Sequence, residues 1–275
     1  MKKIFTILAV AAATLTVSCN KNIPQRNPQV SGKIAIDPLI TRATETDFES
    51  GDKVGLTIKR GEEVFAQNYC MTYDGSVFTS DLGWYSEGEQ NSIFSAYYPY
   101  AEQTPQTFSV GADQSSEAYF SSDLMGSLKE DVTPQASVTM LFKHLMTRIV
   151  VNIDNQVGAT VTSVKLQNSV ASCDVDFAQM QVSVKEAEAS DIAMYPVTKD
   201  ARYAAIVVPQ TVKFRVAIAI DGGKVITKSL NEVTLKAGGQ YTINAVIMAT
   251  DVAVSLSGEI ENWSDEGVIP EKEIT

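Results

Sequence analysis

Apolar and polar residues alternate along much of the chain, as they do in strands that bury one face of a sheet. The alternation is strongest over residues 145–153 and 241–247, and over residues 212–220, which return after a glycine-rich turn as residues 224–230. No convincing amphipathic helix interrupts these stretches, so we expect an all-β fold built of sandwiches. Shorter runs with strand character cover residues 53–58, 63–70, 92–98, 137–142, 161–167, 171–177 and 202–208.

The chain length and the distribution of these runs predict two β-sandwich domains in tandem. The chain has 275 residues, and a loop-rich stretch at 99–135 precedes the densest run of β-branched residues. We therefore expect one sandwich over residues 30–143 and a second over residues 144–275. The polar stretch 19–29 contains two prolines and is expected to be a flexible tether.

The first 18 residues have the features of a bacterial export signal. Lys2 and Lys3 precede an uncharged, mostly apolar run of 14 residues, which is shorter than the roughly 20 residues needed to span a bilayer. The sequence Leu15-Thr16-Val17-Ser18-Cys19 resembles a lipobox, so we expect cleavage between Ser18 and Cys19 and acylation of Cys19, with palmitate among the chains. The alternative is an ordinary secretory signal in which Cys19 is incidental.

The mature chain is strongly acidic. Removing residues 1–18 takes away two lysines and changes the formal net charge from −11 to −13. Such a polyanion repels nucleic acid, which is therefore not expected as a partner. Cys70 and Cys173 remain after Cys19. They could pair in an oxidising compartment, but they lie in different halves of the chain, so two free buried thiols are the preferred interpretation.

The sequence contains no residue pattern typical of catalysis or of cofactor binding. Its one histidine, His144, is flanked by apolar residues and is interpreted as a hydrogen-bonded structural residue. The chain has no Gly-x-Ser-x-Gly elbow, no phosphate-binding glycine loop and no EF-hand spacing. We therefore expect a protein that is not an enzyme and that uses no cofactor. The acidic stretch 259–273 is interpreted as a solvated terminus and not as a metal site.

One aromatic cluster has two interpretations. The sequence Tyr97-Tyr98-Pro99-Tyr100 follows Trp84 and Tyr85, and such rings could form a surface that stacks on sugars. Alternatively, the rings belong to a strand end and enter the core. The second interpretation is preferred, because aromatic residues of β-sandwiches mostly fill cores.

Eight segments, taken in order along the chain, form a distinctive set. They are Ile40-Thr41-Arg42-Ala43-Thr44, Phe48-Glu49-Ser50-Gly51-Asp52-Lys53-Val54-Gly55-Leu56, Phe94-Ser95-Ala96-Tyr97-Tyr98-Pro99-Tyr100, Ser122-Asp123-Leu124-Met125, Phe142-Lys143-His144-Leu145, Val208-Pro209-Gln210, Leu235-Lys236-Ala237-Gly238-Gly239-Gln240-Tyr241 and Ile260-Glu261-Asn262-Trp263. Together they resemble the fimbrillin-like family, the type V pilins and related surface lipoproteins of Gram-negative bacteria. The resemblance implies two transthyretin-like Greek-key β-sandwich domains, a lipid anchor in the outer membrane, and a role in a cell-surface fimbrium. It also implies other fimbrial subunits, identical or paralogous, as partners.

The resemblance further implies how such subunits assemble. Type V pilins are exported as lipoproteins, and an arginine-specific protease then removes the anchor together with the first β-strand. The loss opens a hydrophobic groove, which a strand of another subunit fills by β-strand addition. In this chain, residues 30–40 have the pattern of such a removable strand, with Ile34 and Ile36 on one face.

The expected processing site lies directly after this strand, at Arg42 and Ala43. Arg26 is the other candidate, but cleavage there would leave the strand in place. Alternatively, Arg42 is an ordinary exposed loop residue of a lipoprotein that is never processed.

The C-terminal part contains a possible donor strand. Val252, Val254, Leu256 and Ile260 occupy one face of an extended stretch, and Gly258 weakens that face because it adds no apolar surface. This alternation suits a strand that fills a partner's groove. It suits equally the last strand of the chain's own second domain.

Two functions follow from these observations. The leading hypothesis is a structural subunit or anchor of a type V fimbrium that assembles by β-strand addition. The alternative is an outer-membrane lipoprotein that does not polymerise and binds a host glycan or host protein through Trp84 and the Tyr97–Tyr100 region.

Overall fold

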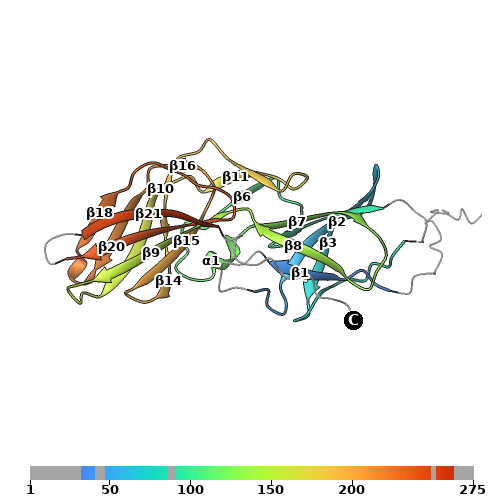
Figure 1. Cartoon of the computed structure of the whole chain (residues 1–275), viewed down its shortest axis with the longest axis horizontal. Helices are drawn as coiled ribbons and strands as arrows, with labels where there is room; N and C mark the ends of the chain where they lie inside the picture. Colours follow the sequence, from blue (N-terminus) through green and yellow to red (C-terminus); the bar gives the residue numbers. More distant parts are fainter. Residues whose placement is uncertain (1–31, 41–46, 86–90, 249–251, 263–275) are drawn as a thin grey trace, which may run out of the picture.

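The structure, a computed structural model, describes residues 32–40, 47–85, 91–248 and 252–262, the last of these for the backbone only. Within these residues, the helical elements are the four-residue helix α1 (Ala118–Ser121) and the 3-10 turn η1 (Asp221–Gly223), and the other regular elements are strands. The predicted all-β class is therefore confirmed. No helix in this described part is long and apolar enough to cross a membrane. Figure 1 shows the strands in two groups along the long axis of the molecule.

The first group of strands forms one sheet that closes on itself. Its order is β1-β4-β3-β2-β5-β7-β8, and β8 pairs with β1 to complete the ring. The β1–β8 pairing is parallel, whereas the other neighbours are antiparallel. The strands are β1 (Ile36–Ile40), β2 (Lys53–Arg60), β3 (Glu63–Tyr73), β4 (Phe78–Thr79), β5 (Ser92–Tyr98), β7 (Met125–Val132) and β8 (Val138–His144).

The second group contains two larger sheets and two small ones. One sheet has the order β13-β10-β17-β18, and the other has the order β14-β15-β9-β20-β21. The bounds are β9 (Thr147–Asn155), β10 (Val161–Ser169), β13 (Ser190–Ala193), β14 (Tyr195–Thr198), β15 (Arg202–Val207), β17 (Arg215–Ile220), β18 (Val225–Ser229), β20 (Gly239–Ile247) and β21 (Val252–Asn262). One small sheet contains β6 (Thr107–Ser109), β11 (Ser172–Asp176) and β12 (Gln181–Val184). The other contains β16 (Thr211–Val212) and β19 (Val233–Thr234).

Each group encloses its own hydrophobic core. The first core is lined by residues of β1, β2, β5 and β8, and along β8 the buried residues alternate strictly with exposed ones. The second core lies between the four-stranded and five-stranded sheets, where Val164 and Ile218 of one sheet belong to the same buried cluster as Val151 and Ile243 of the other. The period-two pattern of the sequence thus correctly indicated which side chains are inside.

The chain between the two groups holds them together. Helix α1 packs on the five-stranded sheet, where Tyr119 stacks on Tyr195 of β14 at 4.8 Å. In the same segment, the side-chain amide of Gln114 exchanges hydrogen bonds of 2.8 and 2.7 Å with the backbone N–H and C=O of Ile206 in β15. The second group also contacts the first, because the ring of Phe177, just after β11, stacks on Tyr97 of β5 at 4.6 Å between ring centroids. The hydroxyl of Ser95 donates to the carbonyl of Phe177 at 3.3 Å.

The structure contains strands that the sequence patterns did not predict, among them β12, β13 and β14 within residues 178–201. Strand β7 lies inside the stretch 99–135 that was expected to be loop-rich, because pairing with β5 imposes an extended conformation on a weakly alternating sequence. The predicted strand 212–220 is divided between β16 and β17. Strand β9 buries Arg148 and Val150 as well as its predicted inner face, because α1 lies on that second side, where Tyr119 and Arg148 line a common pocket.

Candidate functional site

The first strand, β1, lies between β4 and β8 and closes the first sheet. On one side it runs parallel to β8 over five residue pairs, from Ile36 opposite Val138 to Ile40 opposite Phe142. On the other side it is joined to β4 by the pair of Ile36 and Phe78. The predicted inward residues Ile34 and Ile36 are fully buried, as the alternation of residues 30–40 indicated. β1 is thus both a backbone bridge and part of the core.

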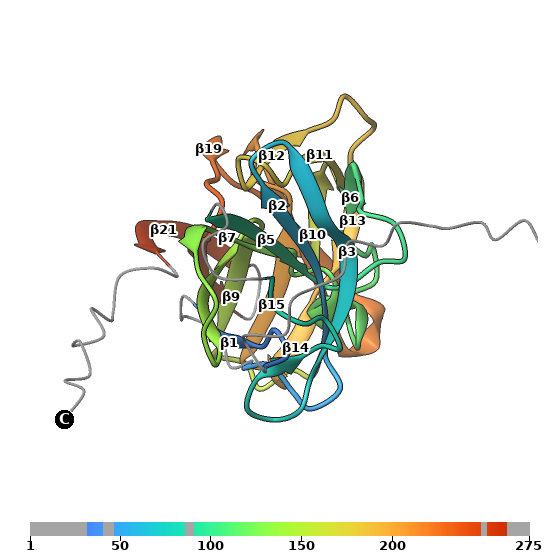
Figure 2. The same ribbon diagram turned by 90° about the vertical axis from the view of Figure 1, so that its right-hand side faces the viewer.

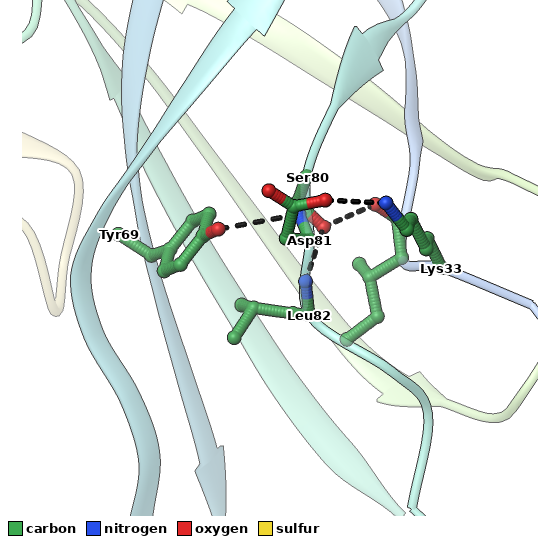
Figure 3. Close-up of polar contacts among 6 residues, drawn as sticks. Lys33, Tyr69, Ser80, Asp81 and Leu82 are labelled. Atoms are coloured by element: carbon green, nitrogen blue, oxygen red, sulfur yellow. Dashed lines mark hydrogen bonds and ion pairs between the residues drawn. The ribbon is translucent and has the colours of Figure 1, made fainter.

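The residues just before β1 are held by a second set of contacts, and Figure 3 draws those around Lys33, Ser80 and Asp81. The backbone N–H of Ile34 donates to the carbonyl of Leu82 at 2.7 Å, and the hydroxyl of Ser80 donates to the carbonyl of Ile34 at 2.6 Å. The Lys33 ammonium forms an ion pair with Asp81. This pair raises the pKa of Lys33 and lowers the pKa of Asp81, but both side chains are exposed, so it contributes little to stability.

Beneath β1 lie large apolar side chains of its two neighbours. Phe78 of β4 and Val138, Met140 and Phe142 of β8 are at most 1% exposed. Ile36 of β1 lies opposite Val138 of β8, and both side chains point inward. Every second pair after this one has the same orientation. Without β1, these side chains and two sheet edges would lie open along one apolar groove.

The candidate donor strand, β21, lies at the other end of the chain. It pairs antiparallel with β20 from Val252 opposite Ile247 to Asn262 opposite Gly239, with a register shift between Gln240 and Thr242. β20 is its neighbour on one side, and β21 is the outermost strand in the order of the five-stranded sheet. Figure 2 shows β21 at the periphery of the molecule. The predicted residues Val252, Val254, Leu256 and Ile260 lie on this strand, as does Gly258.

The predicted lipidation and processing residues lie outside the described residues. This applies to Ser18 and Cys19, to Arg26, and to Arg42 and Ala43. Their roles therefore stay predictions. Ile40, the last residue of β1, lies two residues before Arg42, so cleavage at Arg42 would separate all of β1 from the rest of the chain.

His144 is a structural residue, as predicted. It is 3% exposed, and its Nδ1 lies 2.9 Å from both carboxylate oxygens of Asp123. The backbone N–H of Leu145 donates to the carbonyl of Leu124 at 2.8 Å, which ties the same two segments together. These contacts join β8 to the turn after α1, and they unite two of the sequence segments that carry the family resemblance.

Three of the five rings in the aromatic cluster belong to the core, as the preferred interpretation predicted, and Tyr98 and Tyr100 are half-buried. Trp84, Tyr85 and Tyr97 are at most 5% exposed. Trp84 stacks on Phe94 at 5.9 Å, and the half-buried Tyr98 packs edge-on against Phe48 at 5.4 Å. Trp84 and Tyr97 therefore do not present a flat ring face to a sugar.

The two described cysteines are free. Cys173 is buried, and Cys70 is half-buried, so the prediction of two free thiols is correct and only one of them is fully buried. Burial raises the pKa of the Cys173 thiol to about 11. Among the described residues, no three His, Cys, Asp or Glu side chains come together in a way that could hold a metal ion.

The arrangement of strands can be compared with that of known proteins. The sequence profile of the family described as Fimbrillin-like matches residues 41–263, which is most of the chain. The chain belongs to the fimbrillin-like family. The resemblance seen in the sequence segments is thus confirmed. None of the curated proteins matches this fimbrillin-like chain.

Solved structures share the fold of this fimbrillin-like protein. A proposed cell adhesion protein from Bacteroides ovatus aligns with a TM-score of 0.69 and 20% identity, over 84% of this chain and 97% of its own. A second such protein, from Bacteroides uniformis, aligns with a TM-score of 0.65 and 21% identity, over 84% of this chain and 99% of its own. The tip fimbrial protein Mfa3 from Porphyromonas gingivalis, with a C-terminal truncation, aligns with a TM-score of 0.50 and 8% identity, over 82% of this chain and 98% of its own. At these identities the likeness shows the fold alone.

Proposed function

We propose that this fimbrillin-like protein is a structural subunit or anchor of a cell-surface fimbrium and that it assembles by β-strand exchange. Membership of the fimbrillin-like family supports the fimbrial role. The observation that carries the mechanism is the position of β1, which is a separate strand between β4 and β8, contributes fully buried side chains, and ends just before Arg42.

Proteolysis after Arg42 would convert a closed sheet into an acceptor. The cut removes the strand that joins β4 to β8 and leaves unpaired backbone groups on both edges. It also uncovers Phe78, Met140 and Phe142, which are apolar side chains with almost no exposed surface in the intact protein. Exposed apolar surface next to open sheet edges favours the addition of a strand from another molecule.

The proposed donor is β21 of a neighbouring subunit. Its apolar residues Val252, Val254 and Leu256 have the same two-residue spacing as Ile34, Ile36 and Pro38 along β1. As the outermost strand of its own sheet, β21 exchanges one antiparallel neighbour, β20, for two neighbours in the groove. A strand bound on both edges gains backbone hydrogen bonds as well as apolar contacts, and this gain favours the polymer.

Export and anchoring complete the proposal. The precursor reaches the outer membrane through the signal of residues 1–18 and is held there by acylated Cys19. Processing at Arg42 then frees subunits from the membrane, whereas an unprocessed copy keeps its lipid and serves as an anchor. The partners are other fimbrial subunits, and the mechanism requires no cofactor.

The test is limited digestion of the folded chain with an arginine-specific protease. We expect cleavage after Arg42 and a ladder of oligomers on size-exclusion chromatography. The Arg42→Ala variant serves as the matched control and stays monomeric under the same protease. A second variant that ends at residue 251 is expected to be cleaved but not to form ladders. A cleaved full chain that stays folded and monomeric would exclude polymerisation by strand exchange.

A further inference from the structure

A pocket of about 510 Å³ lies at the junction of the two groups of strands. One wall comes from the end of β1 and the segment before β2, and from Tyr98 at the end of β5. The other wall comes from α1 and from strands β9, β14 and β15. The strand-exchange mechanism does not use this pocket, although Ile40 of β1 is one of its lining residues.

Aromatic rings line both walls of the pocket. On one side, Phe48 packs edge-on against Tyr98, with 5.4 Å between ring centroids. On the other side, Tyr119 stacks on Tyr195 at 4.8 Å, and Phe120 meets the same Tyr195 ring edge-on at 5.3 Å. Ring faces and phenol oxygens carry partial negative charge and attract cations.

Carboxylates from separate segments surround these rings. Asp47, Glu49 and Glu117 are exposed pocket residues, and Asp52 and Asp123 complete the set. Asp52 accepts hydrogen bonds from the backbone N–H of Glu49 at 2.8 Å and from the Tyr98 hydroxyl at 3.4 Å.

The electrostatic environment of the pocket is negative. Burial raises the pKa of the Tyr98 phenol, and the carboxylates of Asp52, Asp123 and Glu49 raise it further. One basic side chain of the described lining opposes this charge. It is Arg148 of β9, which is 2% exposed and donates from Nη1 to Oε1 of Gln240 at 3.3 Å.

We propose that this pocket binds an organic cation, namely a guanidinium or alkylammonium group. The carboxylates of Asp47, Glu49, Asp52 and Glu117 supply the attraction against one buried arginine, whereas the Asp123 carboxylate is held by His144. The rings of Phe48, Tyr98, Tyr119 and Tyr195 supply cation–π contacts. A bare metal ion fits less well, since the described carboxylates form no metal-binding group. The cation has two sources, a lysine or arginine side chain of a partner protein or a free amine.

The first experiment compares two ligands of the same shape. N-acetyl-arginine methylamide carries the charge, and N-acetyl-citrulline methylamide is its neutral isostere. In NMR titrations of the full chain, we expect the arginine ligand to bind at least about tenfold more tightly than the citrulline ligand. We also expect its affinity to fall as the salt concentration is raised. Equal affinity for the two ligands would overturn the proposal.

Paired variants then place the binding in the pocket. Glu49→Gln combined with Glu117→Gln removes two exposed lining charges without truncating either side chain, and we expect the arginine ligand to lose about tenfold in affinity. Glu186→Gln combined with Glu188→Gln removes the same charge from exposed positions outside the lining. We expect this control to change affinity less than about twofold. An equal loss in both pairs would mean that the cation responds only to overall charge and would overturn the proposal.

Two further probes distinguish the sources of the cation. They are a pentapeptide with one central arginine among glycines, capped at both ends, and putrescine. Tighter binding of the peptide assigns the pocket to a basic side chain of a partner, and tighter binding of putrescine assigns it to a free amine. If neither probe binds, the proposal is wrong. None of these outcomes depends on polymerisation, so strand exchange stands or fails separately.

Discussion

Ile36 of β1 lies opposite Phe78 of β4, and neither side chain has any exposed surface. This pair joins β1 to β4, whereas five consecutive pairs join β1 to β8. The same residue therefore closes the sheet and fills the core. A strand with this double role stabilises the intact chain. Its removal would leave two unpaired sheet edges and an exposed apolar surface between them.

Truncation of Ile36 tests its contribution to the core. We expect Ile36→Ala to lower the free energy of unfolding of the unprocessed chain by about 2–5 kcal/mol, because the site is fully buried. Leu141→Ala on the adjacent β8 is the matched control. Leu141 is 42% exposed, and its loss is expected to cost less than about 0.5 kcal/mol. Urea denaturation of both variants measures the difference, and similar losses would argue against β1 as a core strand.

The hydrogen bond from Ser80 to the carbonyl of Ile34 gives a test that is specific to β1. We expect Ser80→Ala to lower the stability of the intact chain by about 0.5–1.5 kcal/mol. After cleavage at Arg42 and removal of the first segment, Ile34 is absent, and the same substitution is expected to cost less, because the Ser80 hydroxyl then keeps only the 3.3 Å hydrogen bond that it accepts from the backbone N–H of Leu82. Thermal unfolding before and after cleavage checks this. An equal loss in the intact and the cleaved chain would mean that the hydrogen bond to Ile34 contributes nothing.

The buried contact between His144 and Asp123 is expected to stabilise the junction. Replacing the carboxylate in Asp123→Ala leaves the buried His144 Nδ1 without this partner, and we expect a loss of about 1.5–3 kcal/mol in unfolding free energy. Asp113→Ala, an exposed aspartate on the same connecting segment, is the control. Calorimetric unfolding of both variants measures the effect. Equal stability of the two would contradict a structural role for His144.

The two described cysteines are expected to react at different rates. The pKa of the Cys173 thiol is raised by burial to about 11, so little thiolate is present at pH 8, and reagents reach the buried sulfur only when the structure opens. Cys70 is half-buried. Peptide mapping after brief alkylation is expected to show modification of Cys70 well before Cys173, and comparable rates in denaturant. Faster reaction of Cys173 in the folded chain would contradict its burial.

Sequence patterns predicted much of the fold but few of its long-range pairings. The alternation around Ile34 and Ile36 correctly predicted a buried strand, because burial follows from local period-two spacing. It could not indicate that β8, about a hundred residues later, would pair with β1 in parallel. Strand β7 was missed for a related reason, since its conformation is imposed by its neighbours and not by its own composition.

The candidate sites show the same limit. His144 was recognised as structural from its apolar neighbours, but its partner Asp123 lies 21 residues earlier, and no local signal connects the two. The junction pocket brings together side chains from several distant segments, such as Glu49, Glu117 and Tyr195. Each of these residues is ordinary in its own stretch of sequence, and only the packing of the two groups of strands makes them neighbours.

The central claim is that β1 is lost before assembly. It is tested most directly by the intact mass and N-terminal sequence of the chain in sheared fimbriae from the native cell surface. The account predicts high-mass ladders whose chain begins at Ala43. Assembled ladders in which the chain still carries residues 32–40 would contradict it.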